Sequence, residues 1–66
     1  MAGIEIGQRW AHHNGITYTV ILLANEHSQN ESYPITVVYK GDNGKIWCKP
    51  LGNFLAKMTY VRADRD

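Results

Sequence analysis

The sequence has one cysteine, two prolines and one phenylalanine among its 66 residues, and its charges nearly cancel. A single cysteine cannot form an intramolecular disulfide, which is typical of proteins in a reducing compartment. Seven Lys and Arg against six Asp and Glu give a formal net charge of +1, too little to bind a polyanion through bulk charge. The segment MAGIEIGQRW lacks the basic region and long apolar run of a secretory signal or a membrane span. We therefore expect a cytoplasmic protein in which only a local patch can give affinity for nucleic acid.

Residue groupings that are typical of catalysis and of metal binding are also missing. His12 and His13 are adjacent in an expected strand, so we expect their side chains on opposite faces, where they cannot bind one metal ion together. No Cys-x-x-Cys or His-x-x-x-His spacing is present. The acidic residues fall in expected loops, turns and termini, where no regular structure holds two of them together for acid and base catalysis. The sequence predicts no cofactor, no metal and no enzymatic activity.

Short runs of β-branched and aromatic residues alternate with turn residues along the chain. Asn14-Gly15 favours a two-residue type I′ hairpin, because both positions tolerate a positive φ angle. We expect strands at residues 8–13, 16–24, 33–40, 45–49 and 58–62, and one helical turn at 51–56. This order predicts an all-β fold, a small five-stranded SH3-like barrel with a helical turn before the last strand. We expect one domain over residues 1–66, ordered from about 4 to 62, with a disordered tail at 63–66.

The turn between the third and fourth expected strands determines which side chains face the core. A two-residue turn at Asn43-Gly44 and a four-residue turn at 41–44 give the same faces, and only an odd length exchanges them. The apolar face, which we expect to be the core, carries Ile35, Val37, Tyr39, Ile46 and Cys48. The exposed face carries Thr36, Val38, Lys40, Lys45, Trp47 and Lys49. This register predicts a buried, unreactive cysteine behind a face that combines lysines with a tryptophan.

Two segments of the sequence are candidate binding sites. Lysines around Trp47 suit phosphate contact combined with base stacking, and the same pattern arises when lysine stems lie along a tryptophan that caps the core. The polar loop at 25–32 contains His27 and Ser28, which suit hydrogen bonding or a pH-sensitive contact, although a solvated connection also explains this composition.

From about Trp10 to Val61, the sequence resembles the short bacterial and phage proteins of domain of unknown function 1653. The matching pieces are HHNG, YTV, ANEHS, VVY and a Trp-x-x-Pro-Leu-x-x-Phe segment. Lys49 stands where the family usually has arginine, so an arginine-specific contact does not carry over, and Asn53 stands where it usually has methionine. The resemblance implies a small barrel, a bacterial or prophage setting, and interest in these residues: His13, His27, Ser28, Trp47 and Lys49.

Three binding functions remain open. A protein-interaction adaptor would use exposed aromatic residues as anchors for an unknown protein partner: Trp10, Tyr33 and Trp47. A nucleic-acid-binding module would use the Lys-Trp-Lys face, and a small-ligand pocket would form around His13, His27 and Ser28. The candidate binding residues are Trp10, His13, His27, Ser28, Lys40, Lys45, Trp47 and Lys49. We expect no membrane partner, and exposed strand edges predict a monomer or a weak homodimer.

Overall fold

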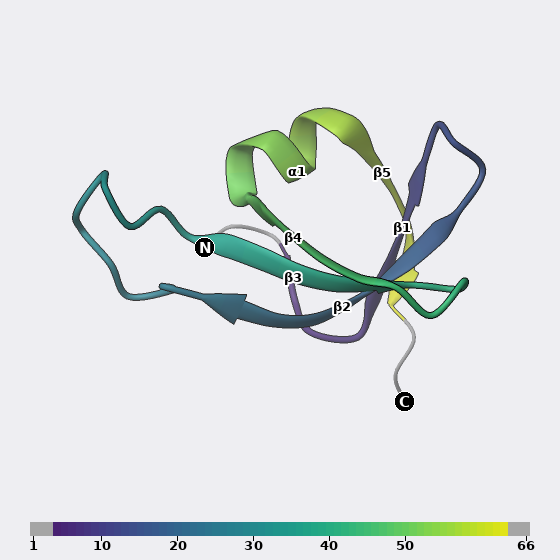
Figure 1. Ribbon diagram of the computed structural model, residues 1–66, viewed down its shortest axis with the longest axis horizontal. Helices are drawn as coiled ribbons and strands as arrows, with labels where there is room; N and C mark the ends of the chain where they lie inside the picture. The colour runs from purple at the N-terminus through teal and green to yellow at the C-terminus, as the bar shows by residue number, and fades with distance from the viewer. Residues whose placement is uncertain (1–3, 64–66) are drawn as a thin grey trace.

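The computed structural model describes residues 4–63, which form five strands and one short helix (Figure 1). In chain order, the elements are β1 (Gln8–His12), β2 (Thr17–Ala24), β3 (Thr36–Gly41), β4 (Ile46–Pro50), α1 (Leu51–Lys57) and β5 (Met58–Ala63). The sequence-based expectation of five strands with a helical segment before the last is confirmed. Ala63, the first residue of the expected disordered tail, ends β5, and the rest of that tail lies outside the described residues.

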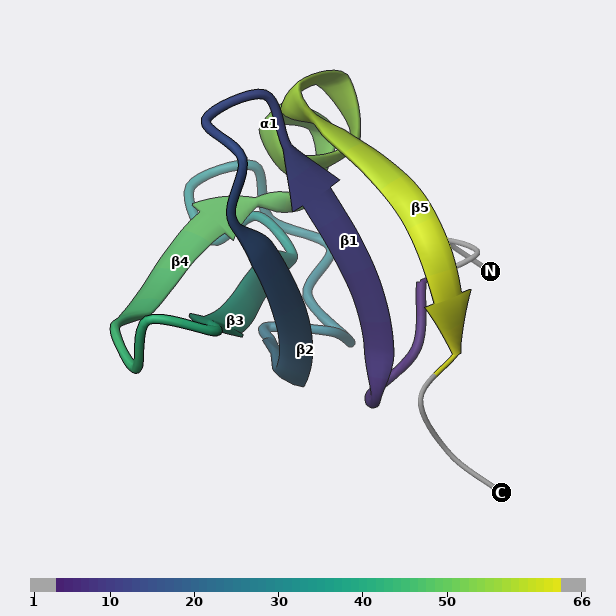
Figure 2. The same cartoon turned by 90° about the vertical axis from the view of Figure 1, so that its right-hand side faces the viewer.

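All five strands form one antiparallel sheet in the order β4-β3-β2-β1-β5. The last strand therefore returns to lie beside the first, and β4 and β5 are the two edges. The sheet is open, so the expected closure into a barrel is not shown. Helix α1 connects the two edge strands across one face of the sheet and contacts β3, β4 and β5 (Figures 1 and 2).

Two bulges help to bend this sheet around the helix. The pairing of β2 with β3 shifts by one residue at Ile21, and the pairing of β1 with β5 shifts at Val61. A bulge leaves one residue without a direct partner, which bends the strand and increases its twist. Figure 2 shows the result, a strongly curved sheet with β4 and β5 on either side and α1 across the top. We call the face that α1 covers the concave face.

The hydrophobic core lies between the concave face and α1. Phe54 is the buried residue of the helix, and its ring lies 5.3 Å from that of Trp10 and 5.1 Å from that of Tyr39. Full burial of an aromatic side chain contributes about 1.5–3 kcal/mol, so this contact holds a helix too short to be stable alone. The buried hydrophobic residues are Ile4, Trp10, Tyr18, Val20, Val37, Tyr39, Phe54 and Met58.

The core includes a residue that the sequence analysis placed on the surface. Trp10, expected to be an exposed anchor, is only 8% exposed, and its indole N–H donates a hydrogen bond to Gln8 Oε1 at 3.2 Å. Its ring packs edge-on against Phe54 and Tyr60. The expectation for Trp10 is wrong because β1 is a central strand, and position 10 faces the helix.

The turn between β1 and β2 contains three residues instead of the predicted two. Residues 13–15 form the loop, because His12 and Ile16 pair directly, with His12 N–H donating to the Ile16 carbonyl at 3.1 Å. Gly15 closes it with a φ of 88°, and Asn14 Oδ1 accepts a hydrogen bond from the Ile16 N–H. Three-residue hairpin loops usually end in such a left-handed residue, so Asn-Gly signals a hairpin without fixing its length.

Gly41, at the end of β3, is a position where the fold requires glycine. A Cβ atom there would lie 2.7 Å from Asn43 Oδ1 and 2.9 Å from Tyr18 Cε2, and the Tyr18 ring is buried. We expect Gly41→Ala to lower the free energy of unfolding by about 1–3 kcal/mol, the usual cost of overpacking a core. Gly52→Ala is the matched control, since a Cβ in α1 meets nothing within 4 Å and should stabilise by about 0.5–1 kcal/mol. Urea unfolding measures both, and equal effects would contradict the packing argument.

Candidate functional site

The turn between β3 and β4 has the same three-residue form and reverses the predicted faces. Gly44, with a φ of 88°, donates its N–H to the Gly41 carbonyl at 2.9 Å, and Gly41 donates to the Lys45 carbonyl at 2.8 Å. Asn43 Oδ1 accepts a hydrogen bond from the Lys45 N–H at 3.1 Å. The loop therefore spans residues 42–44, an odd length, and both even-length predictions are wrong.

This register pairs Tyr39 with Trp47 and Val37 with Lys49. Directly paired residues of antiparallel strands point to the same face, so Trp47 and Lys49 share the concave face with the core, as does Lys45 by alternation. Ile46 and Cys48 face the other way. The predicted burial of these two residues is wrong: Ile46 is 61% exposed and Cys48 is also exposed.

The position of β4 at the edge of the sheet keeps its concave-face residues accessible. Trp47 is 53% exposed, Lys45 is exposed and Lys49 is half-buried. The three residues that we call the β4 face, Lys45, Trp47 and Lys49, therefore stay together as the sequence predicted, but on the opposite side of the sheet. Lys40 does not belong with them, because it pairs with Ile46 and lies on the outer face.

Tyr39, which pairs with Trp47, is an aromatic residue of the core. Tyr39 is buried, and its ring packs edge-on against Tyr18 with the ring centres 5.1 Å apart. Burial raises the pKa of the Tyr39 phenol, and the neighbouring Tyr18 and Cys48 raise it further. The phenol is therefore neutral at physiological pH and adds no negative charge beside the lysines.

The end of the β1–β2 hairpin holds two stacked histidines. Alternation along a strand predicts His12 and His13 on opposite faces, but their ring centres lie 4.1 Å apart with the planes tilted by 31°. That expectation is wrong because His13 has left the strand and lies in the turn. The Asn14 N–H donates to His12 Nδ1 at 3.1 Å, which fixes the orientation of the His12 ring.

His12 also lies near cations that are distant in the sequence. Desolvation lowers its pKa below the ordinary 6.5, and positive charge at His13, Lys49 and Lys57 lowers it further, while an interaction with the Asn14 side chain opposes this by raising it. Neither His12 nor Lys57 is among the binding residues expected from the sequence. Pairing of the last strand with the first brings them together, because Met58, which follows Lys57, pairs with His12.

His27 and Ser28 lie in the 25–35 loop, which projects from the end of the sheet opposite the β3–β4 turn (Figure 1). Ser28 Oγ lies 3.3 Å from the Asn30 carbonyl oxygen and 3.2 Å from the Asn30 N–H, so its polar contacts are within the loop. His27 is exposed. The structure does not bring these residues together with His13, so the expected small-ligand pocket around the three is not formed.

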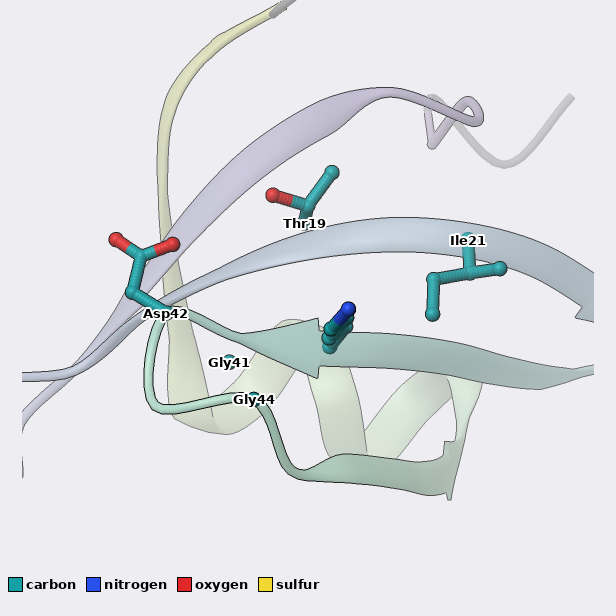
Figure 3. Close-up of a pocket in the computed structure, with 6 residues that line it drawn as sticks. Thr19, Ile21, Gly41, Asp42 and Gly44 are labelled. Atoms are coloured by element: carbon teal, nitrogen blue, oxygen red, sulfur yellow. The ribbon is translucent and has the colours of Figure 1, made fainter.

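A second concave feature lies on the outer face of the sheet. Thr19, Ile21 and Lys40 line a depression of about 470 Å³ together with Gly41, Asp42 and Gly44, and Figure 3 shows Thr19 and Ile21 on β2 with Asp42 at the turn beyond. Arg9 bridges this region, because its Nη2 lies 2.6 Å from Asp42 Oδ2 and its Nη1 donates to Thr19 Oγ1 at 2.9 Å. The ion pair satisfies both charges and ties the β3–β4 turn to β1.

Residues 4–63 contain neither a cluster of metal-binding side chains nor a membrane-spanning helix. No three His, Cys, Asp or Glu side chains gather there in a way that would hold a metal ion. The one helix of the described segment, α1, is also too short to cross a membrane.

Comparisons with known proteins place the chain in a family. Residues 8–65 match the family described as a protein of unknown function (DUF1653), which covers all five strands and the helix. Neither the curated proteins nor the solved structures gave a match.

The pKa of His12 predicts how stability depends on pH. The unfolded chain binds a proton at His12 near pH 6.5, whereas the folded protein binds it only at lower pH, so stability falls as the pH drops below about 6.5. His12→Asn keeps an acceptor near the position of Nδ1 and removes the titration. Urea unfolding between about pH 7.5 and 5.5 should show a shallower pH dependence for the variant than for the wild type. Parallel curves would contradict the assignment to His12.

Proposed function

We propose that this chain, which belongs to the DUF1653 family of proteins of unknown function, is a small non-enzymatic module that binds single-stranded nucleic acid. The observation that carries the proposal is the β4 face, where the three-residue turn puts an exposed indole between two lysines on one side of an edge strand. Trp10 is buried, so the aromatic anchors that the sequence offered to a protein partner are reduced to Tyr33 and Trp47.

The chemistry of the β4 face suits a flexible anionic strand. Residues two apart on one face of a strand lie about 7 Å from each other, so Trp47 has an ammonium group within reach on either side. A base stacks on the indole with little regard to its identity, and each lysine contacts a phosphate without demanding a fixed geometry. The expected binding is therefore tolerant of sequence and sensitive to salt.

A second candidate function is a protein-interaction adaptor that adds a strand to β4. The observation in its favour is the free edge of β4, where Ile46, Trp47 and Cys48 are consecutive and exposed. An extended peptide can pair with such an edge through its backbone. Self-pairing of two β4 strands centred on Trp47 would place Lys45 opposite Lys49 and repel, which favours a monomer.

We also propose an SH3-like fold, a cytoplasmic location and a bacterial or prophage origin for this chain. The strand order, with a helical segment before the last strand, supports an open variant of the SH3-like fold. The single free cysteine supports a reducing cytoplasm, and the family resemblance supports a bacterial or prophage setting.

Lys45→Gln and Lys40→Gln form a matched pair that tests the β4 face. Both lysines are exposed and lose the same charge, but Lys45 lies on the β4 face and Lys40 on the outer face. We expect Lys45→Gln to weaken binding of an oligothymidine about two- to fivefold in low salt, and Lys40→Gln to leave it nearly unchanged. The wild-type salt dependence should give a slope of at least about −1.4 in log K against log salt for two phosphate contacts. Equal losses of oligothymidine affinity in the two variants would contradict the assignment of the β4 face as the binding surface.

Trp47→Leu and Trp47→Phe separate stacking from general hydrophobic contact. We expect oligothymidine to quench Trp47 fluorescence, and we expect Trp47→Leu to lose about 1–3 kcal/mol of binding free energy while Trp47→Phe retains part of it. Trp10 is buried in the core and serves as the internal reference in the Trp47 variants. If no oligonucleotide binds in low salt, the nucleic-acid proposal fails and the protein-interaction adaptor becomes the better-supported function.

A further inference from the structure

A group of basic side chains gathers where the β1–β2 hairpin meets the end of α1. We call it the histidine cluster, and its members are His12, His13, Lys49 and Lys57. His12 pairs with Met58, so it lies on the concave face at the end of the core, and Lys57 is the residue before Met58. The ring of His13 stacks on that of His12 at 4.1 Å.

Lys49 reaches the cluster only because of the odd register of β4. It pairs with Val37, which is fully buried on the concave face, and the curved sheet turns this side of β4 towards β1. In either even register its side chain would point to the outer face. In agreement with this placement, the positive charges of Lys49 and Lys57 lower the pKa of His12.

The hydrogen bond from the Asn14 N–H determines which nitrogen of His12 is free. His12 Nδ1 accepts that bond, so the neutral ring carries its proton on Nε2. His12 therefore offers an N–H donor beside the lysine ammonium groups even when it is uncharged. An acceptor with several oxygen atoms fits such a set of donors.

The charged groups that act on His12 are cations. Among the described residues, none of the groups that shift the pKa of His12 is a carboxylate. Asp42, which lies on the adjacent hairpin, is paired with Arg9 at 2.6 Å. The positive charge around His12 therefore favours binding of an external anion.

We propose that the histidine cluster is a phosphate-binding site, in which His12 Nε2 and the ammonium groups of Lys49 and Lys57 donate hydrogen bonds to one phosphate group. The site rests on the proposed function in one respect, because Lys49 belongs to both the cluster and the β4 face. A strand lying on Trp47 would place its next phosphates at the cluster. The bound phosphate favours protonated His12, so binding strengthens as the pH falls through the pKa of that residue.

The test uses inorganic phosphate first, so that it does not depend on nucleic acid. NMR of the histidine ring protons should show a saturable shift of His12 with phosphate, compared with chloride at equal ionic strength, and a higher pH midpoint for His12 when phosphate is present. Lys57→Gln should weaken this binding about two- to fivefold, since each exposed charge contact contributes up to about 1 kcal/mol. His27→Gln, in the loop at the opposite end of the sheet, is the control and should bind like the wild type.

Oligothymidine binding at about pH 5.5 and about pH 7.5 then links the cluster to the β4 face. The expected result is tighter binding at the lower pH, lost in His12→Asn and reduced in Lys57→Gln, with folding of each variant checked by urea unfolding. Phosphate binding without oligonucleotide binding would support the cluster and overturn the proposed function. Oligonucleotide binding with no phosphate shift at His12 and no effect of Lys57→Gln would overturn the cluster and leave the β4 face in place.

Discussion

The left-handed backbone of Gly44 is the constraint on which the arrangement of this surface depends. At a φ of 88°, Gly44 closes a three-residue loop and brings Gly41 opposite Lys45. Every residue of β4 takes its face from that one pairing, because side chains alternate along a strand. A loop shorter or longer by one residue would move Trp47 to the outer face and bring Ile46 and Cys48 to the concave one.

The β3–β4 hairpin is held by core packing on one face and by an ion pair on the other. Tyr18 lies over Gly41, where no side chain fits, and Tyr18 packs on Tyr39, which in turn contacts Phe54 of the helix. Arg9 holds the turn from the other face through Asp42. Because the core and this ion pair fix the hairpin from both sides, the positions of the lysines on β4 follow from packing and not from attraction to one another.

The edge position of β4 has two effects on function. It leaves an indole and two lysines accessible beside the part of the concave face that α1 covers, and, within residues 4–63, it leaves one edge of β4 unpaired. Lysines on the concave side of that edge oppose pairing between copies, while they attract anions. His12, whose ring stacks on that of His13, lies on the same concave face, and the positive charges of Lys49 on β4 and Lys57 on α1 lower its pKa. Positive charge therefore gathers locally although the chain has a net charge of only +1.

The sequence by itself determined the number, order and approximate bounds of the strands and the helix, because β-branched runs and Asn-Gly turns are local signals. It also determined that Lys45, Trp47 and Lys49 share a face, since their spacing of two holds in any register. Only the tertiary structure decided which face that is, because one residue in the loop length reverses it and Asn-Gly occurs in loops of more than one length. The strand order and the curvature of the sheet decide three further features. They bury Trp10, they put Lys40 on the face opposite the β4 face, and they bring the charges of Lys49 and Lys57 near His12. These involve contacts between distant parts of the chain, which no local pattern encodes.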